Sequence, residues 1–341
     1  MRRQLRAVRR VRRQPLDGAP QVGFLRVEFG PHPRQVEIRH PAIMPRSAQR
    51  IVPTTHATAE LIKSSGHAHV SSLRSATRSR IWTREFAVTC ERLDLPRRVD
   101  RVGTWIGTSG WSYEHWQDVL YHGCSPADRL SRYAAEFDTV ELNASFYRWP
   151  RDAAFTSWQR RLPDGFRMSV KAPRALTHAR KLYSPEYWTG RITAGWDRLY
   201  DKRGLLLVQL PPGMERDDAR LDYFLSRLPW WVPTAVEFRH PSWACEEVFA
   251  LLERHQSAYV VMSGAGLPCV LRATAPTVYV RLHGPDNHWL YGGSYSDDDL
   301  RWWADRIREW QAQGRDVYAY FNNDGGGNAV RNARTLHSFL A

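Results

Sequence analysis

The chain contains little cysteine for its length. Its 341 residues include only Cys90, Cys124, Cys245 and Cys269, and no two of them form a Cys-x-x-Cys pair. Structural zinc sites usually draw on such closely spaced pairs, and disulfide frameworks are typical of small secreted domains. We therefore expect free thiols in a reducing compartment and predict a cytoplasmic protein.

Long apolar runs are also missing. No segment approaches the roughly 18 apolar residues that suggest a membrane-spanning helix, so no membrane association is expected. The arginine-rich start is not followed by a signal-peptide core, because Arg26 and Glu28 interrupt Val22–Phe29. Neither a Walker phosphate loop nor a dinucleotide fingerprint occurs, so no cofactor is predicted.

Acidic residues are scarce only in the first third of the chain. Residues 1–100 hold 20 Lys and Arg against 8 Asp and Glu, whereas residues 101–341 hold 29 against 27. A segment so rich in arginine and proline buries too little apolar surface to offset its ordering entropy. We therefore predict an extension of low order over residues 1–101 and a nearly neutral domain over residues 102–341.

Three interpretations of the extension remain open. It is inert and disordered, or it is a basic arm that contacts nucleic acid or acidic partners. The third interpretation is upstream sequence read from too early a start, with Met44 or Val102 as truer beginnings. A basic tail alone is weak support for nucleic-acid binding.

Eight short apolar runs follow, separated by helical or irregular segments. Such a series predicts an α/β fold, a (β/α)8 TIM-like barrel with its chemistry at the carboxyl ends of the strands. The predicted strands are Thr104–Thr108, Thr139–Ser145, Phe166–Lys171, Gly204–Gln209, Thr234–Arg239, Ala258–Met262, Thr277–His283 and Asp316–Asn322.

Helix signals lie between several of these runs. Ser125-Pro126 precedes a predicted helix over Ala127–Phe137, and Ser296 precedes one over Asp297–Gln313. Further helices are predicted over Asp217–Leu228 and Ala329–Leu340. The crossover Ser263–Pro276 is too short and glycine-rich for a full helix. Among fifteen tryptophans, mostly expected in packing, Trp111 and Trp149 are candidates for a pocket wall.

Polar residues occupy the inward positions near the strand ends, where alternate residues share a face. Burying so many ionisable groups is costly unless they pair or bind a ligand. The alternative is a self-satisfied ion network that pairs Glu141 with Lys171, and Glu237 with Arg239 or Arg281. A ligand-binding mouth is favoured.

The candidate catalytic residues are Glu141, Lys171, Glu237 and His283. The candidate substrate-binding residues are Asn143, Tyr147, Gln209, Arg239, Arg281, Asn322, Asn323, Asp324, Gly325 and Gly326.

The residue types suggest roles. Glu141 and Glu237 are acid/base candidates, Lys171 and Arg281 are expected to hold an anion, and His283 is expected to shuttle protons or orient substrate. Glu141, Glu237 and His283 could also form a three-ligand metal set. The neighbouring cations disfavour it, and no metal site is predicted.

A glycine-rich loop, Asp324-Gly325-Gly326-Gly327-Asn328, follows the last strand and opens the last helix. Glycines at a helix N-terminus expose backbone N–H groups to an anion, and barrels often hold phosphate after strands seven and eight. A tight strand-to-helix turn explains the same glycines equally well.

Several ordered motifs between residues 104 and 340 resemble the YecE-like family, a domain of unknown function. They are Ile106–Tyr113, Thr139–Tyr147, Gln209–Pro212, Glu237–Trp243, Arg281–Gly284 and Tyr320–Asp324. The resemblance implies a TIM-like barrel and no established activity. The family usually has an Asp after strand six, where this chain reads Val261-Met262-Ser263-Gly264, and residues 1–100 have no counterpart in it.

The leading hypothesis is an enzyme that acts on an anionic small molecule, such as a phosphorylated sugar or nucleotide fragment. One alternative is nucleic-acid processing, an analogy that rests on the barrel fold alone. The other is a non-catalytic metabolite-binding module, which uses the same residue types.

Overall fold

The computed structural model describes residues 25–29, 32–37, 102–286 and 288–341. Within the predicted extension, β1 (Leu25–Phe29) and β2 (His32–Glu37) form an antiparallel hairpin that pairs Leu25 with Val36. The rest of residues 1–101, for which low order is predicted, lies outside the described residues. No helix in the described part of the chain is both long and apolar enough to cross a bilayer.

Eight parallel strands form one sheet in the order β3-β11-β10-β8-β7-β6-β5-β4. A parallel bridge between Ser109 and Glu141 joins the two outer members, β3 and β4, so the sheet closes nearly into a barrel. The predicted fold is confirmed. The strands are β3 (Thr104–Thr108), β4 (Thr139–Leu142), β5 (Arg167–Lys171), β6 (Arg203–Gln209), β7 (Thr234–Glu237), β8 (Ala258–Ser263), β10 (Thr277–Leu282) and β11 (Asp316–Phe321).

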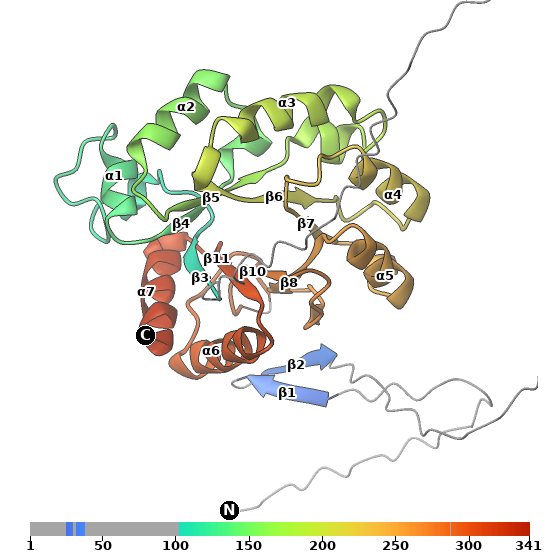
Figure 1. Ribbon diagram of the computed structural model, residues 1–341. Helices are drawn as coiled ribbons and strands as arrows, with labels where there is room; N and C mark the ends of the chain where they lie inside the picture. The colour runs from blue at the N-terminus through green and yellow to red at the C-terminus, as the bar shows by residue number, and fades with distance from the viewer. Residues whose placement is uncertain (1–24, 30–31, 38–101, 287) are drawn as a thin grey trace, which may run out of the picture. The chain divides into compact units, whose positions relative to one another are not determined.

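Helices follow most of the strands and surround the sheet (Figure 1). They are α1 (Arg129–Ala134), α2 (Asp152–Arg161), α3 (Glu186–Asp197), α4 (Asp218–Ser226), α5 (Glu246–Arg254), α6 (Asp297–Ala312) and α7 (Asn328–Leu340). Shorter turns are η1 (Glu114–Trp116), η2 (Ala144–Phe146), η3 (Ala175–Ala179), η4 (Tyr200–Lys202), η5 (Pro241–Trp243) and η6 (Gly325–Gly327). The crossover after β8 contains no helix, as predicted, and only the two-residue strand β9 (Cys269–Val270).

Local signals account for the best-predicted helices. Ser296 and Asp299 form a reciprocal capping box at the start of α6. Asp217 caps α4 by accepting from the Arg220 N–H at 3.0 Å. Gly314 follows α6 with a φ of 75°, which suits glycine after a helix C-terminus.

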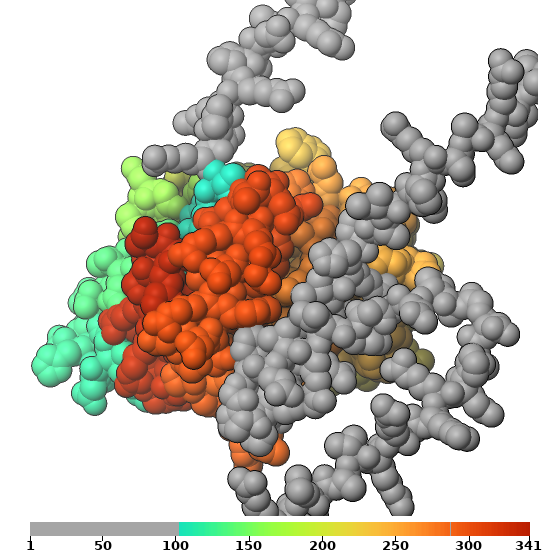
Figure 2. Space-filling view, turned by 90° about the horizontal axis from the view of Figure 1, so that it is seen from below, coloured from blue at the N-terminus to red at the C-terminus, as the bar shows by residue number. Residues whose placement is uncertain are grey.

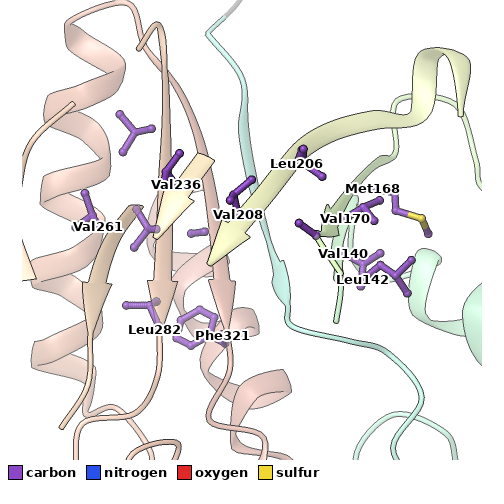
Figure 3. Packing of buried hydrophobic residues seen from close by; sticks show 14 of the residues in the cluster. Val140, Leu142, Met168, Val170, Leu206, Val208, Val236, Val261, Leu282 and Phe321 are labelled. Atoms are coloured by element: carbon purple, nitrogen blue, oxygen red, sulfur yellow. The ribbon is translucent and has the colours of Figure 1, made fainter. Parts of the chain in front are cut away.

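Alternation along the strands separates two apolar clusters. Outward side chains pack beneath the helices, and Figure 3 shows members from β4 to β11 such as Val140, Val208, Val236 and Leu282. Inward side chains fill the barrel as a smaller cluster that includes Leu207, Ala235, Val260, Tyr279 and Tyr320. This interior core fills the barrel towards the amino ends of the strands. Polar groups therefore gather at the carboxyl ends.

The last helix contacts the first crossover of the domain near the point where β3 and β4 close the barrel. Arg334 on α7 pairs with Glu136, which follows α1, and donates to the Val119 carbonyl oxygen at 3.1 Å. Figure 2 shows the red surface of α7 beside the teal surface of the first crossover.

Four strands end earlier than predicted: β10 and β11 by one residue, and β4 and β7 by more. β4 stops at Leu142 instead of Ser145, because the Ser145 hydroxyl donates to the carbonyl oxygens of Leu142 and Lys171 at 2.8 and 2.6 Å and stabilises the turn η2. β7 stops at Glu237, and His240 then caps the short turn η5, which begins at Pro241. Arg239 therefore extends from a loop.

Candidate functional site at the carboxyl end of the barrel

The polar candidates converge at the carboxyl ends of the strands, which we call the mouth. Glu141, Glu237, Arg281 and His283 are completely buried there, on β4, β7 and at or just after the end of β10. Lys171, the last residue of β5, keeps 8% of its surface exposed. Lys171 is therefore more accessible to solvent than the buried carboxylates.

Arg281 bridges the two carboxylates at the centre of the mouth. Its Nε and Nη2 donate to the two Glu141 oxygens at 2.9 and 2.7 Å, a bidentate pair. Its Nη1 donates to Glu237 Oε2 at 2.6 Å. Arg281 and not Lys171 is therefore the ion-pair partner of Glu141.

Each carboxylate has further donors. The Tyr279 hydroxyl donates to Glu141 Oε2 at 2.8 Å, and the Ser109 hydroxyl donates to Oε1. Arg239 Nε donates to Glu237 Oε1. Burial opposes ionisation, but the Arg281 charge and these hydrogen bonds outweigh it, so the pKa of Glu141 is lowered and that of Glu237 lies well below its usual value.

His283 is neutral in this setting. Burial, and then the Arg281 charge, lower its pKa to about 4. Its Nε2 lies 3.1 Å from Arg239 Nη2 and 3.4 Å from Arg281 Nη1, two groups that can only donate. Nε2 therefore accepts, and Nδ1 lies 3.2 Å from the side-chain nitrogen of Asn322. We call Glu141, Glu237, Arg239, Arg281 and His283 the Arg281 network.

Lys171 differs from every member of this network. Its Nζ has neither a hydrogen bond nor an ion pair with any residue that the structure describes, and its one aromatic contact places it 4.4 Å from the centre of the Phe146 ring. Burial, and then the positive charge of Arg281, lower its pKa to about 8; Glu237 and Glu141 oppose this shift, and Arg239 adds to it. The carboxylates that could hold the ammonium group are occupied by Arg281 and Arg239.

Two amide oxygens beside Lys171 also lack partners. Asn143 follows β4 and Gln209 ends β6, and these strands flank β5 in the sheet. Asn143 Oδ1 and Gln209 Oε1 are buried and accept no hydrogen bond from the described residues. A buried acceptor without a donor is costly, and such groups often mark a place where water or ligand supplies the hydrogen.

The remaining candidates lie around the rim. Tyr147 is 80% exposed, and Gly325 and Gly326 are exposed in η6. Asp324 is half-buried, which raises the pKa of its carboxyl, and it lies 3.5 Å from His115 Nε2. A carboxylate at the start of this loop weakens the expected attraction of the glycine-rich loop for an anion.

Asn323 has a different setting. It is fully buried, and its side-chain amide donates to the Gly293 carbonyl oxygen at 3.0 Å and to Asn332 Oδ1 at 2.9 Å. These contacts join β11 to the loop before α6 and to α7, and they give Asn323 a role in holding the rim together.

An apolar cavity of about 510 Å³ lies outside the end of β4. The two tryptophans expected to line a pocket, Trp111 and Trp149, both border it, together with Trp158. A second cavity of about 460 Å³ lies at the opposite end of the barrel, where Thr234, Ala258 and Thr277 begin their strands. Neither cavity is lined by the Arg281 network or by Lys171.

The expected self-satisfied network thus explains half of the mouth. Two glutamates, on β4 and β7, compensate Arg281 and Arg239, and Lys171 remains at the end of β5 as an additional positive charge. No three His, Cys, Asp or Glu side chains converge to hold a metal ion in the described part of the chain.

Sequence reasoning missed Ser109 and left Tyr279 out of the site. Both donate to Glu141 and complete its shell of hydrogen bonds. Trp105 and Gly107 occupy the inward positions of β3, and Ser109 is the next inward position, one residue past the strand. The same alternation therefore indicates Ser109.

The fold and the mouth together define a TIM-like barrel with a buried charge network at its carboxyl end. The chain belongs to the family described as "Protein of unknown function DUF72", whose model matches residues 105–341. It is 28% identical over 272 residues to the UPF0759 protein YunF of Bacillus subtilis, covering 69% of this chain and 94% of that protein. It is 26% identical over 180 residues to the UPF0759 protein YecE of Escherichia coli, covering 52% of this chain and 62% of that protein.

Solved structures agree with this assignment. A DUF72 family protein from Thermotoga maritima superposes with a TM-score of 0.65 at 28% identity, covering 70% of this chain and 99% of that one. A DUF72 family protein from Enterococcus faecalis gives a TM-score of 0.61 at 21% identity, covering 70% and 95%, and this supports the fold alone. None of these descriptions names a substrate.

Proposed function

We propose that this protein is an enzyme that acts on an anionic small molecule bound at the mouth, with a phosphorylated polyhydroxy compound as the substrate class. The observation that carries the proposal is Lys171, a buried amine with no carboxylate partner among the described residues. An anion that reaches it gains a counter-charge in a site partly shielded from water, where electrostatic attraction is stronger than at the surface.

The neighbouring acceptors favour a ligand that carries hydroxyl groups. Asn143 Oδ1 and Gln209 Oε1 require hydrogen-bond donors, and phosphate oxygens at neutral pH are mainly acceptors. A ligand with both an anionic group and hydroxyl groups satisfies Lys171 and the two amides together. A sugar phosphate has this combination.

The first test is thermal unfolding of the full chain with and without glycerol 3-phosphate, with glycerol and inorganic phosphate as matched ligands. At a hundredfold excess over the dissociation constant, binding adds about 2.7 kcal/mol of stability, or roughly 5–10 °C for a domain of this size. Lys171→Met is expected to lose the shift, and Lys181→Met, at an exposed lysine, is expected to keep it. Equal shifts in both variants would place the anion elsewhere.

A second experiment separates the alternatives. Conversion of a bound phosphorylated compound during long incubation supports an enzyme, whereas its full recovery supports a metabolite-binding module. DNA binding that weakens steeply with salt and persists without residues 1–101 favours nucleic-acid processing instead. The near balance of charges in residues 101–341 gives that alternative little support.

A further inference from the structure

Lysine is rare in this chain. Its 49 basic residues include only four lysines, Lys63, Lys171, Lys181 and Lys202, and the others are arginines. Arginine keeps its proton under all ordinary conditions, whereas a lysine amine can lose its proton and become a nucleophile. A lysine at the mouth therefore offers a chemistry that the surrounding arginines cannot supply.

Lys202 shows what distinguishes Lys171. Both side chains are buried, but Lys202 Nζ donates to Asp164 at 3.0 Å and to Asp201 at 2.8 Å. Burial opposes its charge, yet these hydrogen bonds win and raise its pKa. Lys171 has no such partner in the described chain, so burial lowers its pKa to about 8 and makes the neutral amine far more accessible than in an ordinary lysine.

The Arg281 network leaves Lys171 without a carboxylate partner. Arg281 and Arg239 occupy the oxygens of Glu141 and Glu237, so neither carboxylate is left to bind the ammonium group. His178, in the η3 turn after β5, is the nearby imidazole, and its pKa is lowered by burial and then by Lys171. The side chain ends at a carboxyl strand end, as reacting groups in such barrels usually do.

We propose that Lys171 Nζ forms an imine with the carbonyl carbon of a phosphorylated aldehyde or ketone. The neutral amine adds to the carbonyl carbon, and the carbinolamine then loses one water that contains the carbonyl oxygen and both amine hydrogens. Protonation of the imine restores a positive charge at the same nitrogen, so the attraction for the anionic group is retained. This inference rests on the proposed function, since it names the reactive group of the same ligand.

The test uses the full chain and glycolaldehyde phosphate as the probe. Borohydride reduces any imine to a stable secondary amine, and peptide mapping by mass spectrometry locates it. At pH 7.5 an amine with a pKa of about 8 is neutral in roughly a quarter of the molecules, against about one in a thousand for an ordinary lysine. We expect saturable labelling of Lys171, at least about tenfold above that of Lys181, which increases as the pH rises through about 8. Labelling confined to Lys63 and Lys181 overturns the proposal.

Two comparisons separate this inference from the proposed function. If unphosphorylated glycolaldehyde labels Lys171 as well as the phosphorylated probe does, the imine stands and the preference for an anion fails. If glycerol 3-phosphate raises the melting temperature but no Lys171 adduct forms, anion binding stands and the imine fails.

A conservative variant adds an independent readout. Lys171→Arg keeps the positive charge and removes the nucleophile, so it is expected to keep a ligand-induced thermal shift and to lose the reducible adduct. Lys181→Arg, the matched change at an exposed lysine, is expected to keep both. An undiminished total adduct in Lys171→Arg refutes the assignment.

Discussion

Replacing Lys171 by methionine is expected to stabilise the protein, although the position lies in the centre of the site. Most substitutions of buried residues destabilise. Here the wild-type side chain is an unpaired cation in a buried position, and methionine keeps an unbranched chain of similar length without the charge.

The magnitude follows from the pKa of Lys171, which falls from 10.5 in an unperturbed lysine to about 8 in the folded protein. One pKa unit corresponds to about 1.4 kcal/mol, so charging Lys171 costs the folded state about 3 kcal/mol at pH 7. Allowing for lost contacts with Phe146, we expect Lys171→Met to gain about 2 kcal/mol, or roughly 5 °C in melting temperature.

The pH dependence provides a second signature. Between about pH 8 and 10.5 the unfolded chain binds more protons at Lys171 than the folded chain does. The stability contributed through this group therefore rises with pH across that window. The advantage of Lys171→Met is expected to be full below pH 8 and to shrink towards pH 10.5.

The assay is urea unfolding at pH 7 and at pH 10, with Lys202→Met as the matched control. Lys202 keeps only 2% of its surface exposed but pairs with Asp164 and Asp201. Because both aspartates are exposed, its replacement is expected to destabilise by about 1 kcal/mol. Destabilisation by Lys171→Met at pH 7 would refute the reasoning, since it would mean that the ammonium group has a stabilising partner.

Three further predictions concern the rest of the barrel. Arg281→Met leaves Glu141 and Glu237 buried without their shared cation and is expected to cost about 3–5 kcal/mol in urea unfolding; a cost below about 1 kcal/mol contradicts the bridging role. His283, with a folded pKa of about 4 against 6.5 when unfolded, binds fewer protons in the folded state between those values. Stability should therefore fall as the pH drops from 6.5 to 4, and an unchanged acid profile in His283→Gln counts against a neutral buried imidazole. Tyr133→Phe removes a hydroxyl that accepts from a backbone N–H of β3 and donates to a backbone carbonyl of β4. It is expected to cost about 1–3 kcal/mol by chemical denaturation, and a neutral effect argues against a role at the barrel closure.

The sequence by itself determined the architecture. Eight apolar runs separated by crossover-length segments leave few ways to bury that surface, and right-handed crossovers between parallel strands lead to a barrel. Alternation along each strand also places Glu141, Lys171, Glu237 and Arg281 on the inward face near the strand ends. Strand ends were less accurate, because the hydroxyl of Ser145 reaches two carbonyl groups, one of them in the neighbouring strand.

The tertiary structure alone decided which charges are neutralised. The sequence allowed Glu141 to pair with Lys171, but pairing depends on distances inside the barrel. The Arg281 side chain extends from β10 and reaches both Glu141 on β4 and Glu237 on β7. That choice leaves Lys171 without a carboxylate and Asn143 and Gln209 with open acceptors. Periodicity records which face a side chain occupies; only the closed barrel determines which partners it meets there.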